Sequence, residues 1–171
     1  MDALQPLFDW VELNPEWIAI TVGLVAFVES LAVVGIVVPG IALLGGLAAA
    51  AGGLGINPAS LLIGAAIGAF IGDNLSFWIG RAFRPWLENH STIQKYEPQL
   101  EKTRYFLNHK GAVAVVVGRF LGPIRPFMPM VAGMMLMRPT LFLGLSCFST
   151  LAWAPFYILP AWYIAQETIG K

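Results

Sequence analysis

The chain has 171 residues, of which 57% are hydrophobic and only 12% are charged, about half the charge of a soluble domain. Its ten basic and ten acidic residues balance, so the net charge gives no reason to expect a nucleic-acid partner. Between Trp17 and Ile79 the only charged residues are Glu29 and Asp73. This composition excludes a soluble globular domain and predicts an all-α integral membrane protein, with residues 1–171 forming a single domain.

The N-terminal half begins with residues 1–16, where acidic and apolar residues alternate near a helical period. We expect an interfacial helix there, and a frayed terminus is the alternative. Residues 17–38 are apolar and long enough to span a bilayer, but they stop at Pro39-Gly40, and the Gly- and Ala-rich residues 41–54 are short for a span. Two apolar arms that meet at Pro-Gly favour a re-entrant helical hairpin, with two complete spans left open.

The next apolar stretch, residues 61–79, is a predicted transmembrane helix with a glycine at every fourth position, at Gly64, Gly68 and Gly72. This spacing puts the glycines on one face, where another helix can approach closely. It completes a first structural unit, residues 17–80. Residues 81–110 are polar and contain six Lys and Arg, against none before them, which predicts a cytoplasmic amphipathic segment.

Residues 112–137 are apolar but contain two arginines and three prolines within the motif GRFLGPIRPFMPMVAG. Each buried guanidinium costs about 3 kcal/mol on insertion scales, and each proline removes a backbone donor and clashes with the preceding helical turn. Membrane proteins tolerate broken backbone and buried charge together only where they line a cavity or are packed in protein. We therefore predict that this stretch is the working site and that its key residues are Arg119, Arg125, Pro123, Pro126, Pro129 and Gly133.

A further predicted span, residues 140–165, follows this stretch, and the two halves of the chain align when the sequence is shifted by 90 residues. Glu29 then falls on Arg119 and Pro39 on Pro129. Each half reads as a broken hairpin followed by a span. Because a re-entrant hairpin and one span together cross the membrane only once, the second half, residues 111–171, must be inverted relative to the first. Inverted repeats with broken helices that meet near the bilayer midplane are typical of transporters.

Three segments together resemble the DedA family, whose membrane domain is called the VTT or SNARE-associated domain. They are ESLAVVGIVVPG, IGDNLSFWIGR and GRFLGPIRPFMPMVAG. The last is the most specific, because its arginines, prolines and Ala-Gly follow the family's order. The ending WAPFYILPAW resembles DedA domains fused to a membrane phosphatase, so a short form or a piece of such a fusion stays open.

The resemblance implies two facing re-entrant hairpins in a multi-pass protein of the inner (cytoplasmic) membrane. It also implies movement of lipids such as undecaprenyl phosphate or phospholipids between leaflets, with proton coupling. Carried over by motif, Glu29, Asp73, Arg119 and Arg125 are the functional positions. The chain departs from the family at Ile41, since members commonly have an acid directly after the Pro-Gly.

The four charged residues allow two interpretations. A guanidinium suits a phosphate because its planar donors pair with two oxygens while it stays charged, so Arg119 and Arg125 are predicted to bind lipid phosphate. Burial favours the neutral form of Glu29 and a nearby arginine favours the charged form, so Glu29 and Asp73 are candidates for proton coupling. The alternative is purely structural neutralisation, with Arg119 paired to Glu29 and Arg125 to Asp73.

The remaining function classes are weaker. A lipid phosphatase needs a nucleophilic histidine and a second acid/base histidine, and neither His90 nor His109 has such a setting, so we expect no enzyme. No spacing predicts a metal site or a cofactor. A proton-coupled small-ion or drug transporter could use the same charges, and a structural membrane module would not need them. The expected partners are membrane lipids, including a phosphate-bearing substrate, and a homo-oligomer stays open.

Overall fold

The computed structural model describes residues 13–14, 17–32, 34, 40–89 and 97–169. This part of the chain is helical and contains no strand. The elements in chain order are α2 (Ile18–Ser30), α4 (Gly40–Gly53), α5 (Pro58–Ala82), α6 (Arg84–Asn89), α8 (Glu97–Lys110), α9 (Val113–Gly118), the 3₁₀ helix η3 (Gly122–Phe127), α10 (Met128–Met134) and α11 (Pro139–Ile169). Most of the predicted helix in residues 1–16 (1–12 and 15–16) and the break at Pro39 lie outside the described residues.

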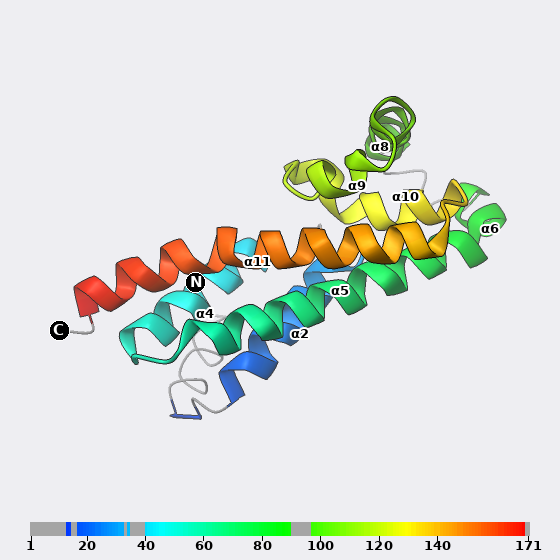
Figure 1. Ribbon diagram of the computed structural model, residues 1–171. Helices are drawn as coiled ribbons and strands as arrows, with labels where there is room; N and C mark the ends of the chain where they lie inside the picture. Colours follow the sequence, from blue (N-terminus) through cyan, green and yellow to red (C-terminus); the bar gives the residue numbers. More distant parts are fainter. Residues whose placement is uncertain (1–12, 15–16, 33, 35–39, 90–96, 170–171) are drawn as a thin grey trace.

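Two helices form the frame of the molecule. Within the described residues, α5 and α11 are the helices that are long and apolar enough to cross a membrane, with 25 and 31 residues. They lie side by side and run in opposite directions (Figure 1). Asn57 caps α5 by accepting a hydrogen bond from the backbone N–H of Ala59 at 2.9 Å, a common way to start a helix. Both predicted spans are thus confirmed as long apolar helices.

The glycine stripe of α5 packs against α2, as the spacing predicted. A methyl group on Gly64, Gly68 or Gly72 would collide with a backbone carbonyl oxygen of α2. The three oxygens belong to residues 19, 23 and 27, in the same order along the chain, so α2 runs parallel to α5. Only glycine allows backbones to approach this closely, and the short distance gives extensive van der Waals contact between the helices.

The apolar residues 17–38 do not form one continuous helix. Helix α2 has 13 residues and ends at Ser30, and Leu31 is extended. The Oγ of Ser76 accepts a hydrogen bond from the N–H of Ala32 and donates one to the carbonyl of Ser30, both at 3.2 Å. Helix α2 therefore ends level with Ser76, six residues before α5 ends.

Helix α4 then returns beside α2, and its first residue, Gly40, lies against the Glu29 side chain. Its other end packs on α11, where Gly52 approaches the carbonyl oxygen of Trp162. With 13 and 14 residues, α2 and α4 are both shorter than the roughly 20 residues that a span requires.

The proline-rich stretch is broken into three short helices, as predicted. Pro123 stands in the first turn of η3, Pro126 inside it, and Pro129 in the first turn of α10. A missing N–H is tolerated in a first turn because no intrahelical bond is lost there. Gly133 in α10 and Gly80 in α5 each approach a carbonyl oxygen of the other helix, which docks α10 closely on α5.

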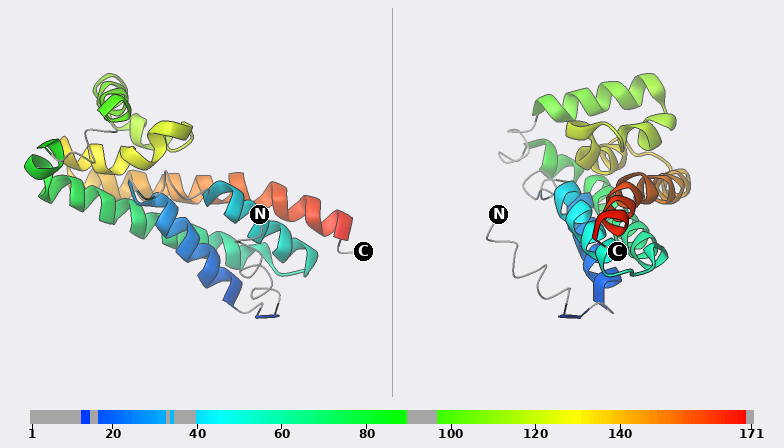
Figure 2. Two further views of the ribbon diagram at one scale, coloured as in Figure 1. Left: turned by 180° about the vertical axis from the view of Figure 1, so that it is seen from behind. Right: turned by 90° about the vertical axis from the view of Figure 1, so that its left-hand side faces the viewer.

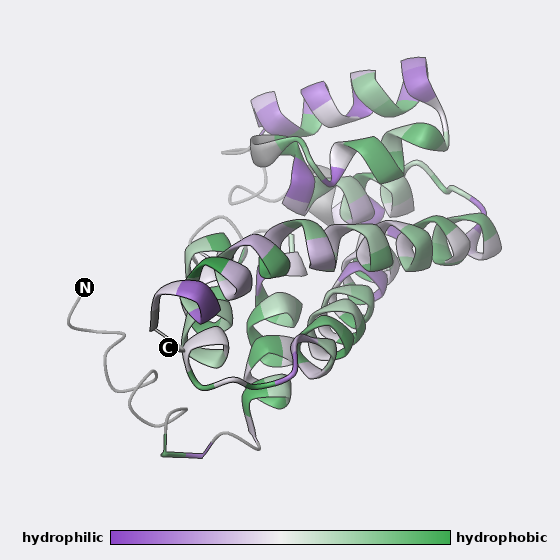
Figure 3. Cartoon of the chain, turned by 60° about the vertical axis from the view of Figure 1, so that its left-hand side comes forward, coloured by the Kyte–Doolittle hydropathy of each residue, from purple (hydrophilic) through white to green (hydrophobic). Residues whose placement is uncertain are grey.

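Helix α8 covers this broken stretch. In all views α9 and α10 lie between α8 and the two long helices, and α2 lies on the opposite side (Figures 1 and 2). Leu100, Thr103 and Leu107 are buried toward the protein, and the hydrophilic residues of α8 are prominent at the top of Figure 3. The amphipathic pattern of this segment is therefore explained by packing of its apolar face on the protein itself.

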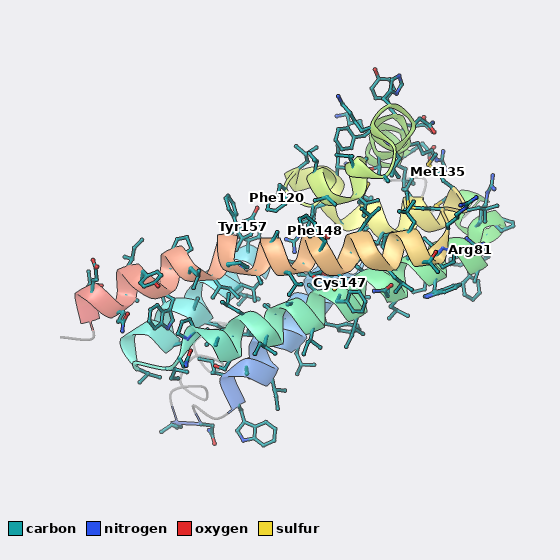
Figure 4. All side chains as sticks on the ribbon, viewed as in Figure 1. Arg81, Phe120, Met135, Cys147, Phe148 and Tyr157 are labelled. Atoms are coloured by element: carbon teal, nitrogen blue, oxygen red, sulfur yellow. The ribbon has the colours of Figure 1, made fainter. Side chains whose placement is uncertain are left out.

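The helix ends at one side of the molecule are tied together by Arg81. Its Nη1 donates a hydrogen bond to the backbone carbonyl of Met137 at 3.0 Å, and Arg81 and Met135 lie at the same end of the molecule in Figure 4. The connection links the last turn of α5 to the turn between α10 and α11.

A buried cluster of two arginines and two carboxylates

The four charged residues that the sequence singled out meet inside the protein. Glu29 lies near the end of α2, Asp73 in α5, Arg119 directly after α9, and Arg125 in η3. Their exposed fractions are 6%, 5%, 5% and 9%. The four charges are thus paired in an apolar interior, where an unpaired charge is very costly.

The ion pairs differ from the expected ones. Arg119 Nη1 donates to Asp73 Oδ2, and Arg125 Nη1 donates to Glu29 Oε1. The pairing named in the structural alternative, Arg119 with Glu29 and Arg125 with Asp73, is therefore wrong. Partner choice depends on which helix ends lie together in space, and a spacing along the chain does not contain that information.

Serine hydroxyls extend the cluster. Ser146 Oγ donates to Asp73 Oδ2 at 3.0 Å, and Arg119 Nη1 lies 3.4 Å from Ser149 Oγ. Both serines are buried in α11. The sequence analysis did not single them out, although Ser146 and Ser149 are three residues apart in an apolar span, a spacing that puts both on one helix face.

The two guanidiniums have donors that are not used. Arg119 Nε, Arg119 Nη2 and Arg125 Nη2 are buried and have no hydrogen-bond partner among the described residues. A cavity of about 10 Å³ adjoins them, about the room that one water molecule needs. It is lined by Ser30, Asp73, Arg119, Arg125, Pro126 and Pro129, together with two apolar side chains. The cavity therefore has room for about one acceptor oxygen and is too small for a phosphate group.

Three of the predicted break residues, Gly40, Pro126 and Pro129, lie next to this cluster. Gly40 begins α4 beside the Glu29 carboxyl group, where any larger residue would press on it. Pro126 and Pro129 line the cavity. Gly133 lies instead in the contact between α10 and α5, where it approaches the backbone carbonyl oxygen of Phe77. The structure thus brings Gly40, Pro126 and Pro129 close to the charges, whereas Gly133 serves the packing of α10 on α5.

Other polar groups lie away from the cluster. His109 is exposed in α8, and its Nδ1 lies 2.8 Å from the carbonyl oxygen of Tyr105, in agreement with the expected surface position. Cys147 is exposed on α11. Among the described residues, no three His, Cys, Asp or Glu side chains gather to form a metal site.

Comparison with known proteins decides the family. Residues 14–163 match the family described as the VTT domain. The chain belongs to the DedA family. The resemblance seen in the arginine and proline motif is thereby confirmed, and a membrane location follows from it.

Two of the following three relatives of this DedA-family protein are membrane proteins by name. It is 40% identical over 137 residues to inner membrane protein YabI of Escherichia coli, covering 80% of this chain and 54% of YabI. It is 32% identical to an uncharacterised membrane protein of Synechocystis, covering 84% of this chain and 67% of the relative. It is 29% identical to protein DedA of Escherichia coli, covering 80% and 64%.

The coverage limits what these relatives imply. The DedA-family chain spans about half the length of YabI and of a Buchnera relative that is 36% identical. No solved structure matches the chain at a significant level.

Proposed function

We propose that this DedA-family protein translocates a phosphate-bearing lipid, such as undecaprenyl phosphate or a phospholipid, between the leaflets of the inner membrane. The observation that carries the proposal is the pair of buried guanidiniums with unused donors, Arg119 and Arg125. Charge-assisted hydrogen bonds from arginine to phosphate are strong and often bidentate. Two arginines held at the end of broken helices in a membrane protein are suited to such an anion.

The cluster is closed in this structure, since its cavity has room for about one water molecule. Translocation therefore requires η3 and α9 to separate from α2 and α5. A phosphate that enters then replaces Glu29 and Asp73 as the partner of the guanidiniums. Glu29 and Asp73 each lose their arginine partner in this exchange, which makes them the candidates for coupling lipid movement to protons.

The topology in this proposal has two re-entrant hairpins that enter from opposite faces. Three features support it: α2 and α4 are too short to span, α2 ends before α5 does, and the stretch from α9 to α10 is broken. In this topology the antiparallel helices α5 and α11 each cross the membrane. The basic segment at residues 81–110 lies in the cytoplasm, and the two halves form the inverted repeat suggested by the 90-residue shift.

The proposal includes no chemical step. Lipid phosphatase chemistry requires two placed histidines, and the described histidine, His109, lies on the surface of α8. Binding, neutralisation and release of the head group are sufficient for translocation. Membrane lipids are then both the surroundings and the substrate.

The test is reconstitution in liposomes with lipids labelled one species at a time, and accessibility of the label from outside as the readout. Arg119→Lys keeps the charge but loses the planar fork, so its rate should fall at least about tenfold while the protein still folds. Arg104→Lys is the matched control, because Arg104 pairs with Glu97 and Glu101 on α8 and not with the carboxylates of the cluster.

A parallel arm measures the flux of a small cation through the same vesicles. Cation flux without lipid movement would favour the proton-coupled small-ion or drug transporter instead. Unchanged lipid movement after replacing all four charged residues with alanine would favour a structural module.

A further inference from the structure

An aromatic side chain from a separate helix underlies both arginines. Trp153 lies in α11, which carries none of the four charged residues, and its side chain is 0% exposed. The Cζ of Arg125 lies 4.4 Å from the centroid of the Trp153 ring, and the Cζ of Arg119 lies 5.3 Å from it. Both distances fall within the roughly 6 Å at which a ring face attracts a cation, and tryptophan is the strongest of the aromatic residues in this respect.

The ring can attract both guanidiniums even when the ion pairs with the carboxylates are broken. Two guanidiniums over one ring repel each other, and their carboxylate partners come from two different helices, α2 and α5. If lipid phosphate displaces the carboxylates, those attractions are lost at the moment of binding. The attraction to the indole face does not depend on either carboxylate, so it continues through the exchange.

We propose that Trp153 is a positioning residue that holds Arg119 and Arg125 in place while they exchange their carboxylates for a lipid phosphate. This inference rests on the proposed function. It also gives a second reason to expect a loss of activity in Arg119→Lys, because a guanidinium can stack on an aromatic face while its edge donates hydrogen bonds.

The indole itself is held by aromatic neighbours. The ring centroids of Trp153 and Tyr157 are 5.5 Å apart, and Phe156 contacts Tyr157 at 5.1 Å and Phe120 at 5.6 Å. Phe120 and Tyr157 lie near each other above α11 in Figure 4. Contacts of this kind favour fixed ring orientations. Trp153, Phe156 and Tyr157 all lie in α11, which belongs to neither broken segment, so the ring is carried by a helix other than α2 and η3.

The test replaces Trp153 site-specifically with mono-, di- and trifluorotryptophan. Fluorine withdraws electrons from the ring face and weakens its attraction for cations, while the volume of the side chain hardly changes. The probe is phosphatidic acid with a labelled acyl chain in phosphatidylcholine liposomes. The rate of label movement should fall stepwise along the series, by between about twofold and about thirtyfold in total.

The matched control is the same series at Trp162, which is also buried in α11. Its Nε1 donates to the carbonyl of Ile56 at 2.8 Å, and neither arginine of the cluster lies over its ring among the described contacts. Fluorination there should leave the rate unchanged. Trp153→Phe should retain more activity than Trp153→Leu, and if the leucine variant does not fold, the fluorinated series still decides.

The outcomes separate the two proposals. If the wild-type protein moves phosphatidic acid and the rate is equal throughout the Trp153 series, the role of Trp153 is wrong and the proposed function stands. If the wild-type protein moves no phosphate-bearing lipid, the proposed function is wrong and this role falls with it. A stepwise decline at Trp153 with a flat response at Trp162 supports both.

Discussion

The pairing of the four buried charges makes a quantitative prediction about stability. Asp73→Asn removes the partner of Arg119 and leaves its guanidinium buried and uncompensated. Breaking a buried pair from one side typically costs about 3–5 kcal/mol. Ser146 also donates to the same carboxylate oxygen at 3.0 Å, and weakening that hydrogen bond adds up to about 1 kcal/mol. We expect Asp73→Asn to lower the free energy of unfolding by about 4 kcal/mol.

The double variant Asp73→Asn with Arg119→Gln should recover part of this loss, because it leaves no unpaired charge. If each single change costs about 4 kcal/mol and the double variant about 5 kcal/mol, the coupling energy is about 3 kcal/mol, at the upper end for interacting residues. A cycle on Glu29 and Arg125 should give a similar value, since they form the second ion pair.

The control is the crossed cycle on Glu29 and Arg119, which form no hydrogen bond or ion pair among the described contacts. Its coupling should stay below about 1 kcal/mol. Unfolding would be measured by titrating the protein in neutral detergent with a denaturing detergent and following helix content. Equal coupling in the observed and crossed cycles would contradict the pairing described above.

Three further predictions concern packing, acidity and topology. Gly68→Ala should destabilise the protein by about 1–3 kcal/mol, because the added methyl group meets the Gly23 carbonyl oxygen. Gly45 has open space around it, so Gly45→Ala should stabilise α4 by about 0.5–1 kcal/mol. The detergent titration measures both changes. Glu29→Gln should make lipid transport less dependent on pH than in the wild type, and an unchanged pH profile would argue against its part in proton coupling. In a Cys147→Ser background, a cysteine at His109 should react with an impermeant maleimide only from the cytoplasmic side.

Several features could be read from the chain because they depend on local chemistry. Apolar length predicted α5 and α11, and the prolines predicted the break after Arg119, since proline cannot continue a helix whatever surrounds it. The four-residue glycine spacing of α5 predicted a close helix contact, and α2 provides it. The stretch from Trp17 to Val38 was harder, because its apolar composition is compatible with a full span, while the helix ends at Ser30.

The sequence by itself determined that this is a helical membrane protein and which four charges must be compensated, because burying a charge in an apolar interior is costly in any fold. Only the tertiary structure decided the partners, Arg119 with Asp73 and Arg125 with Glu29. It alone also placed Trp153 against both guanidiniums. A salt bridge or a cation–ring contact forms only when the groups lie within about 4–6 Å of each other, so these contacts are set by how helices distant in the sequence pack together.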